Sequence, residues 1–190
     1  MTGPVGRAPV AHAQLVPPRD AHGKATRAER RAVLAMTAVH RALEFLGFAV
    51  VDVDAEHDAQ GLQREEDLRI SDGDYLAVVD ATAAPGNAKQ KMFEDLRAYM
   101  ERRRADPRFA DAVVRGMLVV NQHRHDPPML RLQLYETDQR WVTEANARGV
   151  SLVPTWELFR LIRGVTVGDI SKDDARAALQ QPGLFKSPVG

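Results

Sequence analysis

Two aspartates, Asp67 and Asp80, carry the clearest chemistry in this sequence, within the stretch EEDLRISDGDYLAVVDAT (residues 65–82). Two apolar segments, 67–70 and 75–81, flank a Ser-Asp-Gly-Asp turn whose glycine supplies the positive φ of a tight hairpin. Such a hairpin brings Asp67 beside Asp80. Two carboxylates at a strand end suit a hard cation such as Mg²⁺, which also takes water and phosphate oxygens. The bound ion would generate hydroxide and stabilise a phosphodiester transition state.

The alternation of side chains along a strand decides what lies near these acids. Asp80 and Thr82 share one face of the second strand and are neighbours at its exit, and Arg69 shares the face of Asp67. Simpler roles exist for both acids, because Asp80 can accept hydrogen bonds from the following turn and Asp67 can pair with Arg69. The two glutamates directly before Asp67 are typical of a solvated face.

The hydrophobic pattern predicts the elements that must position these residues. Strands cluster early and then alternate with helices, which indicates an α/β domain with a mixed sheet and helices on both faces. A segment at 130–135 is either an edge strand or the return of a loop. The predicted helices are 26–46, 88–104, 138–148 and 154–164, and the predicted strands are 48–53, 67–70, 75–81, 116–121 and 150–153.

The length of 190 residues predicts one domain with a substantial core. Residues 1–24 contain four prolines and few large apolar side chains, so we expect a flexible tail. The domain itself is expected over residues 25–166. Residues 167–190 are interpreted as a C-terminal extension that is partly flexible.

Composition excludes several classes of protein. There is no cysteine, so neither a disulfide framework nor a thiolate zinc site can form. Lysine plus arginine equals aspartate plus glutamate at 26 each, so any attraction for nucleic acid must come from local charge. No apolar run approaches the roughly 20 residues of a membrane span, and no signal pattern opens the chain. We therefore expect a cytoplasmic protein without a membrane partner.

The layout of helix, acidic hairpin, helix and buried strand resembles the PD-(D/E)xK nuclease superfamily, which has the restriction endonuclease-like fold. The resemblance covers residues 26–164. In that family a helical acid precedes an aspartate and then an (Asp/Glu)-x-Lys motif. Matched residue by residue, Asp67 and Asp80 take the two acid positions, Glu44 is the candidate helical acid, and Thr82 falls on the lysine.

The threonine is a departure that the resemblance must accommodate. In the family the lysine positions and activates the attacking water, and Thr82 carries no charge with which to do so. Three explanations stay open. The site is inactive and the fold is kept for binding; the role has passed to Lys89, Lys91 or Arg69; or the residue-by-residue match is wrong.

Three functions follow from these alternatives. The first is a pseudoenzyme that binds, senses or regulates nucleic acid, with DNA favoured over RNA, in the bacterial defence or repair context that the resemblance implies. The second is an active nuclease in which Asp67 and Asp80 hold Mg²⁺ or Mn²⁺, Glu44 assists, and Lys89 or Lys91 replaces the missing lysine. The third is a protein–protein interaction module, for instance a homodimer. A metal is expected only for a working site.

The helix after Asp80 is the candidate surface for nucleic acid. Lys89, Lys91 and Arg97 lie along it, and Arg69 lies beside Asp67. In the functional interpretation these cations follow phosphates next to the acids. In the simpler interpretation they form an ordinary charged face, because acidic residues alternate with them.

Overall fold

The structure is a computed structural model that describes residues 27–53 and 66–189, with side chains from residue 36 onward. Its elements confirm the predicted order of helix, three strands, helix, strand, helix, strand and helix, and then add a helix and a strand. The helices are α1 (Arg27–Leu46), α3 (Gln90–Ala105), α4 (Arg140–Arg148), α5 (Thr155–Val167) and α6 (Lys172–Leu179), and the strands are β1 (Ala49–Asp52), β2 (Leu68–Asp72), β3 (Tyr75–Ala83), β4 (Val113–Asn121), β5 (Val150–Pro154) and β6 (Gly183–Leu184).

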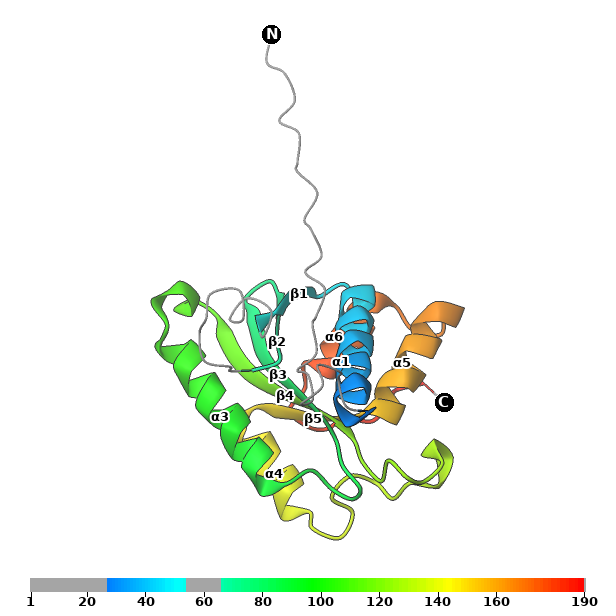
Figure 1. Ribbon diagram of the computed structural model, residues 1–190. Helices are drawn as coiled ribbons and strands as arrows, with labels where there is room; N and C mark the ends of the chain where they lie inside the picture. The colour runs from blue at the N-terminus through cyan, green and yellow to red at the C-terminus, as the bar shows by residue number, and fades with distance from the viewer. Residues whose placement is uncertain (1–26, 54–65, 190) are drawn as a thin grey trace.

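One six-stranded sheet forms the middle layer, and its strands lie side by side in chain order. The pairs β1–β2 and β2–β3 are antiparallel, and the pairs from β3 to β6 are parallel. Helices α3 and α4 cover one face, and α1, α5 and α6 cover the other (Figure 1). The predicted α/β fold with a mixed sheet is therefore confirmed.

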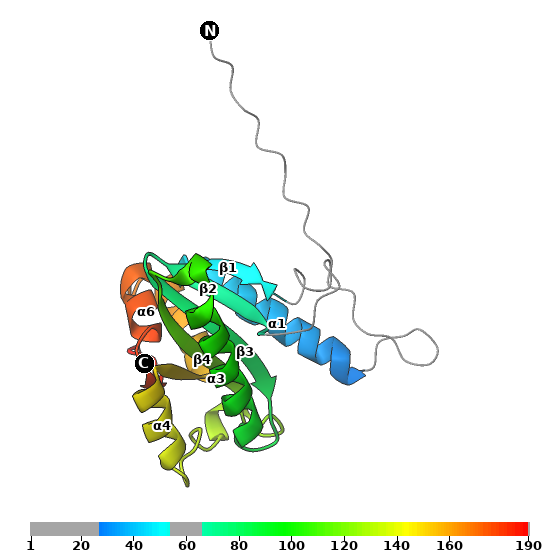
Figure 2. The same cartoon turned by 90° about the vertical axis from the view of Figure 1, so that its left-hand side faces the viewer.

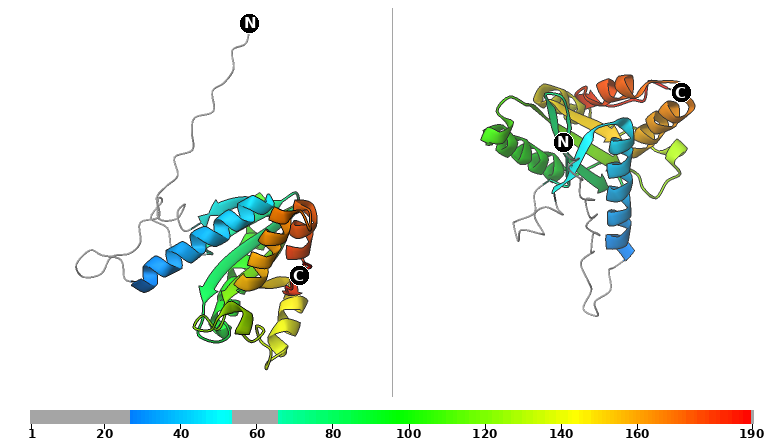
Figure 3. Two further views of the ribbon diagram at one scale, coloured as in Figure 1. Left: turned by 90° about the vertical axis from the view of Figure 1, so that its right-hand side faces the viewer. Right: turned by 90° about the horizontal axis from the view of Figure 1, so that it is seen from above.

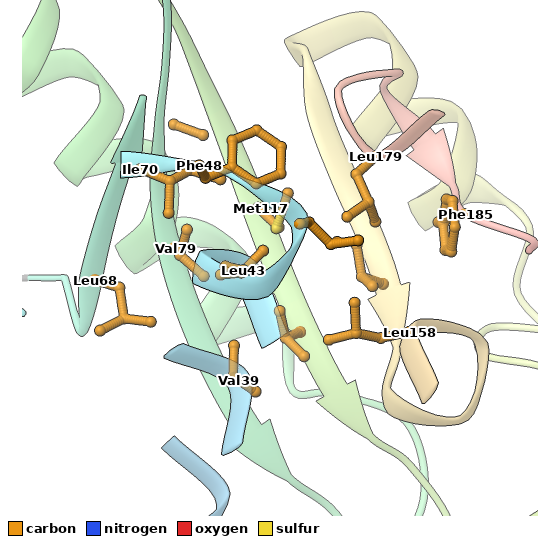
Figure 4. Close-up of a cluster of buried hydrophobic side chains, with 14 of the residues drawn as sticks. Val39, Leu43, Phe48, Leu68, Ile70, Val79, Met117, Leu158, Leu179 and Phe185 are labelled. Atoms are coloured by element: carbon orange, nitrogen blue, oxygen red, sulfur yellow. The ribbon is translucent and has the colours of Figure 1, made fainter. Parts of the chain in front are cut away.

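Strand alternation divides the core into two clusters. Leu68, Ile70 and Val79 point toward α1 and join Leu43 and Met117 in the cluster shown in Figure 4. The neighbouring β3 residues point the other way, toward α3, which packs over β3 and β4 (Figure 2). Each leucine fully buried in this way contributes about 2 kcal/mol to stability. The face on which each β3 residue lies agrees with the sequence prediction.

The hairpin and the end of the first helix also form as predicted. Gly73 turns the β2–β3 hairpin with φ of 63°, and Gly47 ends α1 with φ of 98°. The segment predicted as either an edge strand or a loop is a loop, with a short 3-10 turn at Pro128–Leu130. Its end is anchored because the Tyr135 hydroxyl donates to the Ala88 carbonyl at 3.1 Å.

The predicted end of the last helix at Gly164 is wrong. Helix α5 continues to Val167, and Gly168 takes the left-handed conformation with φ of 85°. Gly164 is instead buried within the helix, because an added Cβ would lie 2.5 Å from a methyl of Val189. A sequence cannot show that a distant residue needs this space.

Residues 167–190 were predicted as an extension, but the structure packs residues 168–189 onto the domain. Helix α6 buries Ala175 and Leu179 fully, and β6 adds the sixth strand. Arg176 of α6 donates to the Leu46 carbonyl at 2.9 Å and to Asp72 at 3.0 Å. Helix α6 thereby connects the end of α1 to the hairpin turn; Figure 3 shows α1, α5 and α6 on this face.

Three predictions concern residues that lie outside the described ranges, namely the tail at 1–24, the start of the first helix and the solvated face at Glu65. Within the described ranges, no helix has the length and apolar character needed to cross a membrane.

Candidate active site: the aspartate pair

The β2–β3 register brings Asp67 and Asp80 together. Leu68 pairs with Val79, so the next residues outward along the two strands, Asp67 and Asp80, lie opposite each other. The Ala81 amide donates to Oδ2 of Asp67 at 2.8 Å, and the two carboxyl groups share a hydrogen bond. The hairpin thus forms the acid pair that its sequence predicts.

The surroundings of Asp80 disfavour its negative charge. The pKa of Asp80 is raised to about 8, first by burial, then by the charge and hydrogen bond of Asp67, and then by the charge of Asp95. The Ala81 amide acts in the opposite direction. A carboxyl group with this pKa holds a proton at neutral pH. The pair is therefore a place where a bound cation would replace a shared proton.

Helix α3 adds two residues that sequence reasoning did not assign to the site. Asp95 acts on Asp80 by its charge. The pKa of Tyr99 is raised by its burial and then by the charges of Asp80, Asp95 and Asp67. Asp95 and Tyr99 are four residues apart, so they share one helix face. The spacing and the buried face of the helix could be predicted from the sequence, but the effect of Asp95 and Tyr99 on the aspartate pair could not.

The two lysines proposed as substitutes make different contacts. Lys91 is 78 % exposed and its Nζ lies 2.5 Å from Oδ2 of Asp95. Lys89 is exposed at the N-cap of α3. Among the described residues, the charges that act most strongly on Asp80 come from acids. The prediction that Lys89 or Lys91 compensates Asp80 directly is not supported by these contacts.

Glu44 is not part of this cluster. It lies on α1, whose buried side chains pack on the opposite face of the sheet from α3. Its carboxylate is 54 % exposed and lies 3.4 Å from Nε2 of His40. The simpler interpretation of Glu44, a surface contact with His40, therefore describes it.

Arg69 and Arg97 also have other neighbours. Arg69 lies over the ring of Phe109 at 5.3 Å, and its Nη1 is 4.0 Å from Glu66. Arg97 pairs with Glu101 at 3.5 Å along α3. The simpler interpretation paired Arg69 with Asp67, but in the structure Arg69 contacts Glu66 instead.

The prediction that Glu66 lies on a solvated face is wrong. Its side chain is fully buried and accepts hydrogen bonds from Nε of Arg103 at 2.7 Å and from Nη2 at 3.1 Å. Arg103 is itself only 7 % exposed. A buried carboxylate needs such a partner, and the partner is 37 residues away in sequence.

The aspartate pair fits a magnesium or manganese ion of the kind that the nuclease resemblance implies. Mg²⁺ accepts one or two carboxylates together with waters and substrate phosphates. Asp67 and Asp80 supply two, and within residues 36–53 and 66–189 no group of three His, Cys, Asp or Glu could hold an ion. The described residues thus offer an incomplete shell that water and phosphate would have to fill.

Comparison with solved structures relates this geometry to a known fold. The chain is similar to the restriction endonuclease FokI bound to DNA, with a TM-score of 0.51 and 12 % identity over 81 % of this chain. The fold is restriction endonuclease-like. The chain spans only 28 % of the FokI chain. No protein-family model matches the chain, and no curated protein matches it either.

In this restriction endonuclease-like domain, Thr82 lies two residues after Asp80 on β3 and opposite Val120 of β4. Alternation places Thr82 on the same face of the strand as Asp80. Its hydroxyl can form hydrogen bonds, but it brings no positive charge to the acid pair.

The loops at the carboxyl ends of β3 and β4 add cations at the same edge of the sheet. Arg124 donates from its backbone to the Ala84 carbonyl at 3.1 Å and from Nη1 to the Ala83 carbonyl at 3.4 Å. Arg131 donates to Oδ1 of Asn121 at 2.5 Å. Sequence reasoning treated this segment as a loop without naming these arginines, because nothing local indicates that it folds back onto β3.

Proposed function

We propose that this protein is a nucleic-acid-binding domain with a restriction endonuclease-like fold that has kept the acid pair but lost the cation needed for efficient cleavage. The observation that carries the proposal is the set of charges around Asp80. Asp67 and Asp95 both act to protonate it, and Thr82 occupies the position that holds lysine in the nuclease family.

The chemical consequence is a poor site for activating water. In the part of the chain that the structure describes, the charges that act most strongly on Asp80 are those of acids, so a nucleophilic water there would have neighbours that disfavour hydroxide. Lys91, one of the two candidate lysines, is already paired with Asp95. Asp80 also holds its own proton near neutral pH, so it is a weak base there.

A nucleic acid is the ligand that best suits the edge of the sheet where these residues lie. Lys89 and Arg124 are exposed there, and Arg131 lies nearby on the loop after β4. Arginine and lysine at such an edge contact phosphate oxygens without regard to sequence. The similar FokI structure is bound to DNA, and DNA is accordingly our first candidate.

A divalent ion would contribute to binding rather than to cleavage in this proposal. Mg²⁺ or Mn²⁺ held by Asp67 and Asp80 would neutralise charge between the acids and a phosphate. The two side chains would orient the ion, and Asp80 would release its proton to do so. Nucleic-acid binding should therefore strengthen with the divalent ion and with rising pH.

The decisive experiment measures binding and cleavage on the same samples. Labelled single-stranded DNA, double-stranded DNA and RNA are titrated with the protein, with Mg²⁺, with Mn²⁺ and with neither. We expect binding without cleavage, and weaker binding for Lys89→Gln/Arg124→Gln. The control Arg41→Gln/Arg163→Gln removes the same charge from exposed positions on α1 and α5. Absence of binding to all three nucleic acids would overturn the proposal.

An active nuclease is the second candidate, and the pairing of Asp67 with Asp80 favours it. Two adjacent carboxyl groups near a strand end are what metal-dependent phosphodiester cleavage requires. Cleavage that disappears in Asp80→Ala would establish this function and replace the first proposal. Cleavage that persists in Asp80→Ala would come from a contaminant.

An interaction module is the third candidate, favoured by exposed apolar residues on the loop after β4. Met129 is 82 % exposed and Leu130 is 76 % exposed. Light scattering at several protein concentrations tests the homodimer form of this candidate, since Met129→Ser/Leu130→Ser would dissociate a dimer built on this loop.

A further inference from the structure

A second functional candidate is a hollow of about 440 Å³ lined by α3, α4 and the starts of β4 and β5. Its side chains include Arg97 and Arg104 of α3, Arg115 of β4 and Arg148 at the end of α4. The amino ends of β4 and β5 border this hollow, whereas Asp80 lies near the carboxyl end of β3. The hollow is therefore separate from the aspartate pair.

Two of these arginines are held in position by the backbone. Nη2 of Arg104 donates to the Val114 carbonyl at 3.1 Å. Arg115 lies against Gly149, where an added Cβ would be 2.8 Å from Nη1. Gly149 also has φ of 73°, so it ends α4 and leaves room for the guanidinium group at the same time.

The other two arginines have acidic partners on their own helices. Arg97 lies 3.5 Å from Glu101, and Arg148 pairs with Glu144. Of the charged residues that line the hollow, four are arginines and one, Glu101, is acidic, a net charge of +3. The whole chain has a net charge of zero, so this is a strong local concentration of positive charge.

We propose that this hollow binds a run of neighbouring phosphate groups. A guanidinium group has five N–H donors in a planar fork, and the contacts described above leave donors available on each arginine. Arginine forks bind phosphate oxygens in pairs. The volume also lies within the usual range of small-ligand sites, about 300–1,000 Å³. The ligand is either a free polyphosphate, such as that of a nucleotide, or the backbone of a nucleic acid.

The first test titrates inorganic triphosphate into the full chain by calorimetry at low salt. Loss of two charge-assisted contacts in Arg97→Gln/Arg104→Gln should weaken binding at least about tenfold. The control Arg41→Gln/Arg163→Gln should bind as the wild type does. Thermal unfolding verifies that both variants fold. Equal affinity in both variants, or no triphosphate binding by the wild type, would overturn the proposal.

A second experiment identifies the source of the phosphates. The same experiment separates this inference from the proposed function, because the inference does not rest on that function. A labelled oligonucleotide that competes with triphosphate, and loses affinity in Arg97→Gln/Arg104→Gln, identifies a nucleic-acid backbone. Triphosphate binding without oligonucleotide binding identifies a free polyphosphate and overturns the proposed function alone. Oligonucleotide binding that is unaffected by the variant and by triphosphate, together with no triphosphate binding by the wild type, keeps the proposed function and overturns this inference.

Discussion

Two consecutive acids, Glu66 and Asp67, have opposite environments. Glu66 is fully buried and receives two hydrogen bonds from Arg103. Asp67 lies against another acid, Asp80, whose pKa is raised to about 8 by its burial and then by Asp67. At Glu66 a buried carboxylate is satisfied by an arginine, whereas Asp67 makes ionisation of its neighbour Asp80 less favourable.

Helix α3 accounts for the difference. It presents Arg103 to Glu66 and Asp95 to the aspartate pair. These two residues are eight positions apart, about 12 Å along a helix. Glu66 therefore has the environment of a structural residue. Asp67 and Asp80 instead form a site at which a bound cation would be stabilising. Strongly shifted pKa values, such as that of Asp80, are concentrated at functional sites.

Removing Arg103, the partner of Glu66, should strongly destabilise the fold. Arg103→Met leaves the Glu66 carboxylate buried without its main partner, so we expect a loss of about 3 kcal/mol in the free energy of unfolding. Urea denaturation measures this loss. The exposed neighbour Arg102 is the control, because Arg102→Met should cost no more than about 0.5 kcal/mol. Similar losses of stability in Arg103→Met and Arg102→Met would show that the buried contact with Glu66 has no special importance.

Neutralising Asp80 should have the opposite effect and increase the free energy of unfolding. The pKa of Asp80 is raised, so its contribution to stability is complete below about pH 4, its ordinary value, and is lost as the pH rises through about 8. Asp80→Asn cannot ionise. Relative to wild type it should gain stability between pH 5 and pH 8.5, by at most about 1.4 kcal/mol per pH unit. Urea denaturation across this range measures the gain, and a constant difference would contradict it.

Metal binding should depend on the same proton. An ion at Asp67 and Asp80 must displace the proton of Asp80, so affinity for Mn²⁺ should rise up to about tenfold per pH unit below pH 8. Calorimetry with Mn²⁺ alone at about pH 6, 7 and 8 tests this. Affinity that is independent of pH, or that survives in Asp80→Asn, would place the ion elsewhere.

A cation placed beside Asp67 and Asp80 should stabilise their negative charge, as Arg103 stabilises that of Glu66. In Thr82→Lys the new ammonium group would lie on the face of Asp80, lower its pKa, and raise stability at pH 8 by about 1 kcal/mol. The pH profile of unfolding should flatten accordingly. Metal-dependent cleavage gained by this variant would identify the threonine as the missing element of the site, whereas an unchanged pH profile would show that the side chain at position 82 faces away from Asp80.

The smallest effect is expected on the exposed face of α3. Lys91→Gln removes an exposed ion pair with Asp95, so the stability change should be within about 0.5 kcal/mol. Equilibrium unfolding at low and high salt measures it. A larger loss would mean that Lys91 compensates Asp80 through Asp95, and would revive its proposed role as the displaced lysine.

Local patterns in the sequence predicted the parts of the fold that depend on neighbours along the chain. Strand alternation predicted which β3 residues share a face, and Gly73 predicted the hairpin turn. The hairpin in turn predicted the contact between Asp67 and Asp80. Each of these follows from backbone geometry over fewer than 20 residues, so no knowledge of packing was required.

The remainder depended on contacts between distant segments. Arg103 meets Glu66 across 37 residues, and Gly164 makes room for Val189. The placement of Asp95 near the aspartates required the rotation of α3 about its axis, which a periodic charge pattern does not specify. Asp67 and Asp80 could be found from the sequence, but the charges that tune them could not.

The connection made by Arg176 has a consequence for the order in which the protein forms during synthesis. Its contacts with Leu46 and Asp72 join residues 130 and 104 positions apart. The first helix and the hairpin leave the ribosome well before α6, so their final arrangement must wait for it. The acid pair can therefore form early within its hairpin, while the sheet around it is complete only after β6 at residues 183 and 184 has been translated.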